Sequence, residues 1–225
     1  MPNDCTNNLN ASGNGKTIES FYKKYITQNK NEEPFLDFDK VIPMPKELDV
    51  SKNSSAEHVY DLLYGLVQYK NNPAQVENMV NMFFLKKEVE ESGKTPEELI
   101  EEILKHSPTA KEEAEQYHSN FQKYGAKTWY DWRLENWGTK WNSYDCFAET
   151  DEDHIYMQFS TAWSPCTPVV KKLIEDNPEL AFSFSYDEPG MGFRGEIEGS
   201  NGQVTKDHYE EYEYEDEEED DEEDE

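Results

Sequence analysis

The segment Gly13 to Thr17 comes closest to a chemical motif, because it reads Gly-Asn-Gly-Lys-Thr. Backbone N–H groups at a helix start, together with a lysine and a hydroxyl, can cradle a phosphate. The full phosphate-loop motif needs an earlier glycine, and Asn10 occupies that position. An ordinary turn before a helix is therefore the favoured interpretation, with nucleotide binding as the alternative.

Five tryptophans gather with basic residues in a way that suits stacking. They are Trp129, Trp132, Trp137, Trp141 and Trp163, and Lys127, Arg133 and Lys140 lie among them. Single-stranded nucleic acid stacks its bases on aromatic faces beside cations. Large rings also bury much apolar area between a helix and a sheet. We expect most of these rings to be core, since a formal charge of -29 opposes binding to a polyanion.

The carboxyl-terminal residues form a dense line of carboxylates. Of the 19 residues from Asp207 to Glu225, 15 are acidic. Like charges at this density repel one another too strongly to pack, which predicts a disordered acidic tail over residues 206–225. Such a tail either keeps a protein soluble or offers negative charge to a basic groove of the kind that holds DNA.

Residue sets that would catalyse a reaction are not recognisable. The five histidines are scattered, no serine or cysteine lies in a Gly-x-Ser-x-Gly setting, and carboxylates are too numerous for one pair to be informative. Cys5, Cys146 and Cys166 are far apart and lack a Cys-x-x-Cys spacing, so neither a disulfide framework nor a zinc site is indicated. We expect no catalytic residue, no metal and no cofactor.

The elements that would position these residues begin with a strand and a helix. Residues 4–12 alternate apolar and polar side chains as a strand does. Residues 13–15 supply a glycine-rich turn, and residues 18–26 carry the single apolar stripe of a helix. The chain is therefore expected to open with strand, turn and helix.

Residues 51–117 differ from the rest because their apolar patterns are helical. Three apolar stripes recur there at spacings of three and four residues, and Thr95 with Glu98 matches a helix capping box. The sequence predicts a helical insert over residues 51–117, between two parts of one domain at residues 1–50 and 118–205.

After the tryptophan-rich stretch the pattern becomes alternating. Residues 144–159 alternate on either side of a turn at residues 150–153, which predicts a β-hairpin. A helix from Thr167 and a strand over residues 180–186 follow, and residues 191–198 are a further strand candidate. The predicted fold is α+β: a ferredoxin-like split β-α-β antiparallel sheet with helices on one face.

Strand alternation predicts a polar sheet face on the side away from the helices. Its expected members are Thr6, Asn8, Asn10, Phe147, His154, Tyr156, Gln158, Ser183, Ser185 and Arg194. A candidate small-ligand site on this face would use His154, Tyr156 and Arg194. An antiparallel sheet with one solvated face needs polar residues there anyway, so the pattern also fits a face without a site.

Charge and composition disfavour several classes of function. With 50 acidic against 21 basic residues, most of the surface would repel DNA and anionic membranes, so a basic or neutral partner is expected and direct nucleic-acid binding is disfavoured. The polar first 14 residues lack the features of a signal peptide, and no run approaches the roughly 20 apolar residues of a membrane span. A cytoplasmic protein without membrane association is predicted.

Several segments resemble one family. They are the opening Met-Pro-Asn with Cys5 and Asn7, Phe38 to Pro45, Trp129 to Trp141, Thr161 to Pro165, and Glu188 to Phe193. In these segments the chain resembles the Api92-like, YubB-type proteins of phages and plasmids. The resemblance implies a ferredoxin-like domain, a mobile-element origin and no established activity.

These observations lead to a hypothesis of function by binding. The chain is expected to be a non-enzymatic phage or plasmid accessory protein, an acidic DNA mimic that occupies a basic host defence or regulatory protein. The expected partner-binding residues are Tyr209, Glu210, Glu211, Tyr212, Glu213, Tyr214, Asp216, Glu217 and Glu218, with the tyrosines as apolar anchors. Two alternatives stay open: a small-ligand protein or enzyme that uses the polar sheet face, and a virion structural or assembly protein.

Overall fold

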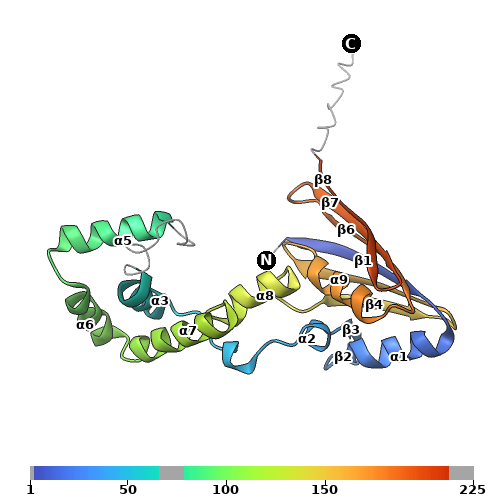
Figure 1. Ribbon diagram of the computed structural model, residues 1–225, viewed down its shortest axis with the longest axis horizontal. Helices are drawn as coiled ribbons and strands as arrows, with labels where there is room; N and C mark the ends of the chain where they lie inside the picture. Colours follow the sequence, from blue (N-terminus) through green and yellow to red (C-terminus); the bar gives the residue numbers. More distant parts are fainter. Residues whose placement is uncertain (1–2, 66–78, 213–225) are drawn as a thin grey trace, which may run out of the picture. The chain divides into compact units, whose positions relative to one another are not determined.

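The computed structural model describes residues 3–65 and 79–212, with side chains from residue 85 onward in the second range. The chain divides into two compact units, Met1–Pro43 with Arg133–Glu225, and Met44–Trp132 (Figure 1). The second unit contains the predicted insert, residues 51–117, and extends beyond it in sequence at both ends. Hydrogen bonds join the segment before the insert to the residues after it. Asn120 Nδ2 donates to the Glu47 and Lys127 carbonyls at 3.0 Å.

A six-stranded antiparallel sheet forms the centre of the first unit, in the order β4-β5-β1-β6-β7-β8 (Figure 1). Its strands are β1 Asp4–Ser12, β4 Tyr144–Thr150, β5 His154–Ala162, β6 Ala181–Glu188, β7 Phe193–Ser200 and β8 Gln203–Glu211. Helix α1 (Gly15–Tyr25) follows β1, and helix α9 (Thr167–Asp176) joins β5 to β6. The first four strands in this order, with their two helices, are the split β-α-β arrangement that the sequence predicts.

Helices α1 and α9 pack on the face of the sheet that carries the apolar side chains. Their buried residues are Ile18, Phe21 and Tyr25 of α1 and Val169, Val170, Leu173 and Ile174 of α9. The strands contribute Leu9, Met157, Phe159, Phe182 and Phe184, all nearly inaccessible to solvent. Burial of a side chain of this size contributes about 1.5–3 kcal/mol, so this face holds the core of the unit.

Three short elements lie between α1 and the second unit. They are β2 (Ile26–Gln28), β3 (Pro34–Leu36) and α2 (Phe38–Val41), and β2 pairs with β3 as a separate two-stranded sheet. Phe38 of α2 is buried, with its ring centroid 6.3 Å from that of Phe159. These elements therefore extend the core beyond α1.

The prediction of a disordered tail over residues 206–225 is wrong for residues 206–211, because these residues belong to strand β8 of the sheet. Its register with β7 sets Glu210 opposite Arg194 and Lys206 opposite Glu198. Repulsion between the carboxylates is relieved by cations on neighbouring elements. Lys206 Nζ lies 2.7 Å from Glu196 Oε1, Lys171 Nζ lies 2.6 Å from Asp207 Oδ2, and Arg194 forms an ion pair with Glu210.

Strand β4 departs from the predicted alternation at one point. Its register with β5 shifts between Tyr144 and Phe147, and Asp145 adopts a φ of 49°. A bulge of this kind inserts one residue into a strand, and aspartate tolerates the left-handed conformation better than most residues. Tyr144 consequently faces the same side as Phe147, whereas simple alternation predicted it beside Cys146 and Ala148.

The second unit is helical throughout its described residues. Its elements are η1 Lys46–Leu48, α3 Ser54–Tyr60, the π-helical turn η2 Asp61–Gly65, α5 Met79–Ser92, α6 Pro96–His106 and α7 Ala110–Tyr124, and α8 (Trp129–Trp137) crosses into the first unit. The predicted capping box starts α6, since Thr95 Oγ1 accepts from the Glu98 N–H at 3.2 Å and Glu98 Oε2 accepts from the Thr95 N–H at 2.8 Å. None of the described helices combines the length and apolarity that a membrane crossing requires.

Candidate functional site

The turn from Gly13 to Thr17 caps α1 with its own side chains. Asn14 Oδ1 accepts hydrogen bonds from the backbone N–H groups of Lys16 at 3.1 Å and Thr17 at 3.2 Å. The Thr17 hydroxyl donates to the Asn14 carbonyl at 2.7 Å, and the Gly13 N–H donates to the Asp153 carbonyl at 2.9 Å. These donors are the ones that a bound phosphate would need, so the geometry favours the ordinary turn over nucleotide binding.

The tryptophans divide between core and surface. Trp132 and Trp137 are buried, and Trp137 Nε1 donates to the Ile42 carbonyl at 2.9 Å. Trp141 and Trp163 are 41% and 43% exposed. The expectation that most of the rings are core therefore holds for these two buried rings and fails for the two exposed ones, which lie outside the helix where the packing argument applies.

The polar face of the sheet is present, but its three candidate residues are not brought together. The Tyr156 hydroxyl donates to Asn8 Oδ1 at 3.0 Å, and His154 lies two residues earlier on the same strand. Arg194 lies on β7 opposite Asp187, and β1 and β6 separate it from β5. That separation is about 14 Å across the sheet. The small-ligand alternative therefore lacks an assembled site at these residues.

A shallow hollow of about 290 Å³ surrounds Arg194 on the same face. Its charged groups pair with one another. Arg194 forms an ion pair with Glu210, His208 Nε2 lies 3.6 Å from Glu210 Oε2, and the Tyr212 hydroxyl donates to Asp187 Oδ1 at 2.6 Å. The hydrogen bond and the charge of Arg194 lower the pKa of Glu210 below its usual value of 4.5. The pair of Arg194 with Glu210 joins β8 to β7, and the hydrogen bond of Tyr212 joins the residue after β8 to β6.

The predicted partner-binding residues fall into two groups. Tyr209, Glu210 and Glu211 lie on β8, and the N–H of the next residue, Tyr212, donates to the Gly192 carbonyl at 2.7 Å. Glu213, Tyr214, Asp216, Glu217 and Glu218 lie outside the described residues. The first group is therefore an ordered part of the domain edge rather than of a tail.

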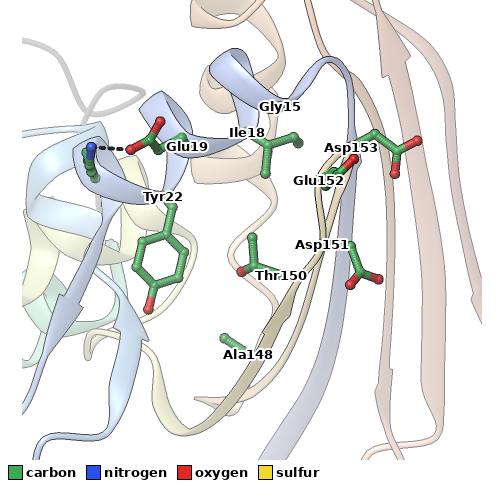
Figure 2. Close-up of a pocket in the computed structure, with 10 residues that line it drawn as sticks. Gly15, Ile18, Glu19, Tyr22, Ala148, Thr150, Asp151, Glu152 and Asp153 are labelled. Atoms are coloured by element: carbon green, nitrogen blue, oxygen red, sulfur yellow. Dashed lines mark hydrogen bonds and ion pairs between the residues drawn. The ribbon is translucent and has the colours of Figure 1, made fainter.

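A larger groove, of about 1040 Å³, lies between α1 and the β4–β5 hairpin (Figure 2). It is lined by Gly15, Ile18, Glu19, Tyr22 and Lys23 of α1 and by Ala148, Thr150, Asp151, Glu152 and Asp153 of the hairpin. Figure 2 shows Ile18 and Tyr22 of the helix facing Thr150 and Ala148 of the strand. The groove thus joins an apolar wall to an acidic rim.

The close approach of the hairpin to α1 depends on Gly15. A Cβ atom at this position would lie 2.8 Å from the Glu152 carbonyl oxygen, closer than a side chain allows. The sequence predicts both the turn at 150–153 and the helix, but their proximity follows only from the fold. Three consecutive acids at a hairpin turn were the one local signal of this groove.

The cysteine thiols are held in their neutral form. Burial raises the pKa of Cys5 to about 12 and raises the pKa of Cys166 well above its usual value. Such thiols are poor nucleophiles at neutral pH because the thiolate is the reactive species. Among residues 3–65 and 79–212, no group of three or more His, Cys, Asp or Glu side chains is arranged to hold a metal ion.

Comparison with known families gives one match, over the carboxyl-terminal part of the chain. Residues 136–225 match the family model described as the ferredoxin-like domain in Api92-like protein. Over these residues the chain is similar to the ferredoxin-like domain of Api92-like proteins. This range holds β4 to β8 and α9, whereas β1, which lies between β5 and β6 in the sheet, and α1 come from outside it. The resemblance and the fold class that the sequence predicts are confirmed.

Among solved structures, the chain is similar to the crystal structure of a protein Api92 from Yersinia pseudotuberculosis. The two are 10% identical with a TM-score of 0.45, and the alignment covers 95% of this chain and 99% of that chain. A comparison with curated proteins found no match. The description of the Api92-like domain names a fold and no activity, so function has to be argued from the surfaces described above.

Proposed function

We propose that this chain is a non-enzymatic accessory protein of a phage or plasmid that binds a basic protein partner in the host cytoplasm and mimics the charge of DNA. The supporting observation is the edge of the sheet at β8. This strand carries Asp207, Glu210 and Glu211, and twelve of the thirteen residues that follow Tyr212 are acidic. A line of carboxylates therefore begins on a rigid strand.

The cations near β8 support a basic rather than an anionic partner. Lys171, Arg194 and Lys206 each form an ion pair with a carboxylate of β7 or β8. A polyanion that approached this edge would have to displace those carboxylates and would be repelled by the acidic residues that follow Tyr212 in the sequence, whereas a basic groove would be attracted by them. Charge complementarity of this kind accelerates association and excludes partners of the same sign.

Two tyrosines supply apolar contact within this charged edge. Tyr209 is 54% exposed, and its ring centroid lies 5.9 Å from that of Phe193. Tyr212 is half-buried and follows β8 directly. Aromatic side chains that are already held by packing lose little freedom on binding and often carry much of the affinity of an interface. Tyr209 and Tyr212 are therefore the proposed anchors beside the carboxylates.

The test is the binding of a fluorescent 20-residue polylysine, followed by anisotropy at low and at physiological salt. We compare the full chain with a variant in which the twelve acids of residues 213–225 become amides. The expected result is a loss of affinity of about tenfold or more and a weaker dependence on salt. Equal affinity and equal salt dependence of the two proteins would contradict the proposal.

A control variant removes a smaller amount of charge from another exposed surface. Glu97→Gln, Glu101→Gln, Glu112→Gln and Glu115→Gln together neutralise four solvent-exposed carboxylates of the second unit. This variant is expected to bind polylysine within about twofold of the unmodified chain, because dispersed surface charges act weakly at physiological salt. Capture from host lysate with the same three proteins then identifies natural partners whose retention depends on the acidic run.

A further inference from the structure

Part of the outer edge of β4 is open. The Asp151 N–H donates to the His154 carbonyl at 2.8 Å, which closes the hairpin. Hydrogen-bonded pairs alternate along an antiparallel ladder, so the backbone of Glu149 also faces β5, where it lies opposite Tyr156. The N–H and C=O groups of Ala148 and Thr150 are therefore directed away from the sheet.

The neighbouring strand β3 approaches β4 near the start of this edge. The Ser143 hydroxyl donates to the Leu36 carbonyl at 2.8 Å, just before β4 begins. In the described sheets β3 pairs with β2 and not with β4. Among the described residues, the outward N–H and C=O groups of Ala148 and Thr150 thus have no backbone partner, and free groups of this kind are the template that an added strand requires.

The groove lies directly beside this free edge. Ala148 and Thr150 form one wall with their side chains, and Ile18 and Tyr22 of α1 form the other (Figure 2). Side chains of a strand alternate between the two faces of a sheet. A strand added to β4 would therefore direct every second side chain toward Ile18 and Tyr22, where apolar residues fit.

The charged residues along the rim of the groove are mostly acidic. Glu19, Asp151, Glu152 and Asp153 line it, against one cation, Lys23, which pairs with Glu19. Within residues 3–65 and 79–212, no cation pairs with the three carboxylates of the hairpin. Glu149 adds a fifth acid on the opposite face of the strand. Basic side chains would complement this rim.

We propose that this groove docks an extended basic segment of a partner protein, which adds as a strand to the Ala148–Thr150 edge of β4. Its apolar residues face Ile18 and Tyr22, and its lysines or arginines face Glu149 and the acidic turn. The inference deepens the proposed function and rests on it for the class of partner. The docking site is separate, because β4 and β8 are opposite edges of the sheet.

The probe is a nine-residue peptide of alternating valine and lysine, titrated into the full chain and followed by backbone NMR. The expected result is a shift of the Ala148 and Thr150 amide signals. The same peptide with N-methyl groups on alternate residues keeps its charge but lacks those backbone donors. It is expected to bind about tenfold more weakly. Equal binding of both peptides, or shifts confined to residues 203–211, would overturn the proposal.

Two variants test the edge and the rim independently. Thr150→Pro removes an outward N–H without removing a bond to β5, and is expected to abolish the shift at Ala148. Asp151→Asn, Glu152→Gln and Asp153→Asn together are expected to weaken the peptide about tenfold. The control is Glu97→Gln, Glu101→Gln and Glu112→Gln in the second unit. Wild-type binding by both groove variants would overturn the docking site.

The amide variant of residues 213–225 separates this inference from the proposed function. The peptide is expected to give the same shifts at Ala148 and Thr150 in that variant as in the unmodified chain. If the shifts persist while polylysine binding is unaffected by the amides, the acidic run has no role and the groove is supported. If the shifts vanish while polylysine binding still depends on the acidic run, the groove is overturned and the proposed function stands.

Discussion

The two outer strands of the sheet, β4 and β8, are protected in opposite ways. The residues of β8 are exposed on both faces, except for Glu210, and ion pairs to neighbouring elements hold the strand in place. β4 is half-buried at Tyr144, Cys146 and Ala148, and three consecutive carboxylates lie in the turn that follows it. Charged side chains along an edge discourage further pairing. The comparison indicates that β8 is closed to strand addition and that β4 is open to it.

The largest expected difference between the two edges is in their contribution to stability. Ile18 beneath the β4 groove is 1% exposed, and Val204 on β8 is 40% exposed. We expect Ile18→Ala to lower the free energy of unfolding by about 2–5 kcal/mol. We expect Val204→Ala to change it by less than about 0.5 kcal/mol. Urea denaturation measures both, and similar losses would show that Val204 of β8 is packed as closely as Ile18 of α1.

A side chain at Gly195 of β7 would disrupt the pairing of β7 with β8 and leave the other edge of the sheet intact. A Cβ there would contact the Tyr186 ring and lie 2.5 Å from the His208 carbonyl oxygen of β8. We expect Gly195→Val to cost about 1–3 kcal/mol through overpacking. Hydrogen exchange should show loss of amide protection in β7 and β8 and retention in β4 and β5. Ser185→Val, on the open face of β6, is the control and should leave both pairs protected.

Proline substitutions at two adjacent residues of β4 test whether the outer edge of this strand is open. The Glu149 N–H faces β5, so Glu149→Pro removes a ladder hydrogen bond to Tyr156, the residue opposite, at a cost of about 1–3 kcal/mol. Thr150→Pro removes only an outward donor and should cost less than about 1 kcal/mol. Thermal unfolding of the two variants measures the difference. Equal midpoints would mean that the outward N–H already has a partner.

The smallest expected effect is the pH dependence of the β8 ion pair. The pKa of Glu210 is lowered from its usual 4.5 by the hydrogen bond and charge of Arg194. A carboxyl whose pKa is lower in the folded state stabilises that state above its usual pKa, and the contribution is lost as pH falls through the lowered value. Amide exchange in β8 should therefore accelerate below pH 4.5 before exchange in β4 does.

The control for this pH prediction is Arg194→Gln. The variant should return the pKa of Glu210 toward its usual value, because the two largest causes of the shift are removed and only the smaller effect of His208 still lowers it. NMR titration of the Glu210 carboxyl carbon measures that pKa directly. An unchanged midpoint in the variant would mean that the pair with Arg194 does not form in solution.

The sequence predicts strands that have one buried face and fails for the strand that has none. Apolar alternation in β1, β5 and β6 reports their contact with the helices, and Leu9, Met157 and Phe184 are buried as that pattern implies. β8 contributes no residue to the core, so its charges resembled those of a tail. The cations that pair with its carboxylates, Lys171 and Arg194, lie on other elements, so the sequence pattern within β8 does not include them.

The candidate sites also depend on residues that are far apart in the sequence, which a local pattern does not bring together. His154 and Tyr156 share a strand, but the sequence could not show that β1 and β6 lie between them and Arg194. The groove joins Gly15 to Glu152, residues whose proximity follows from the fold and not from spacing. Local chemistry, such as the Thr95 and Glu98 capping box, was predictable because both partners lie within one turn.

The most direct test of the account compares two labelled ligands with the full chain in physiological salt. One is the nine-residue valine-lysine peptide, and the other is a single-stranded DNA of about 20 nucleotides, long enough to span a typical single-strand binding site. Fluorescence anisotropy should detect binding of the peptide, weakened by added salt, and none of the DNA. Tight binding of the DNA without binding of the peptide would contradict the account.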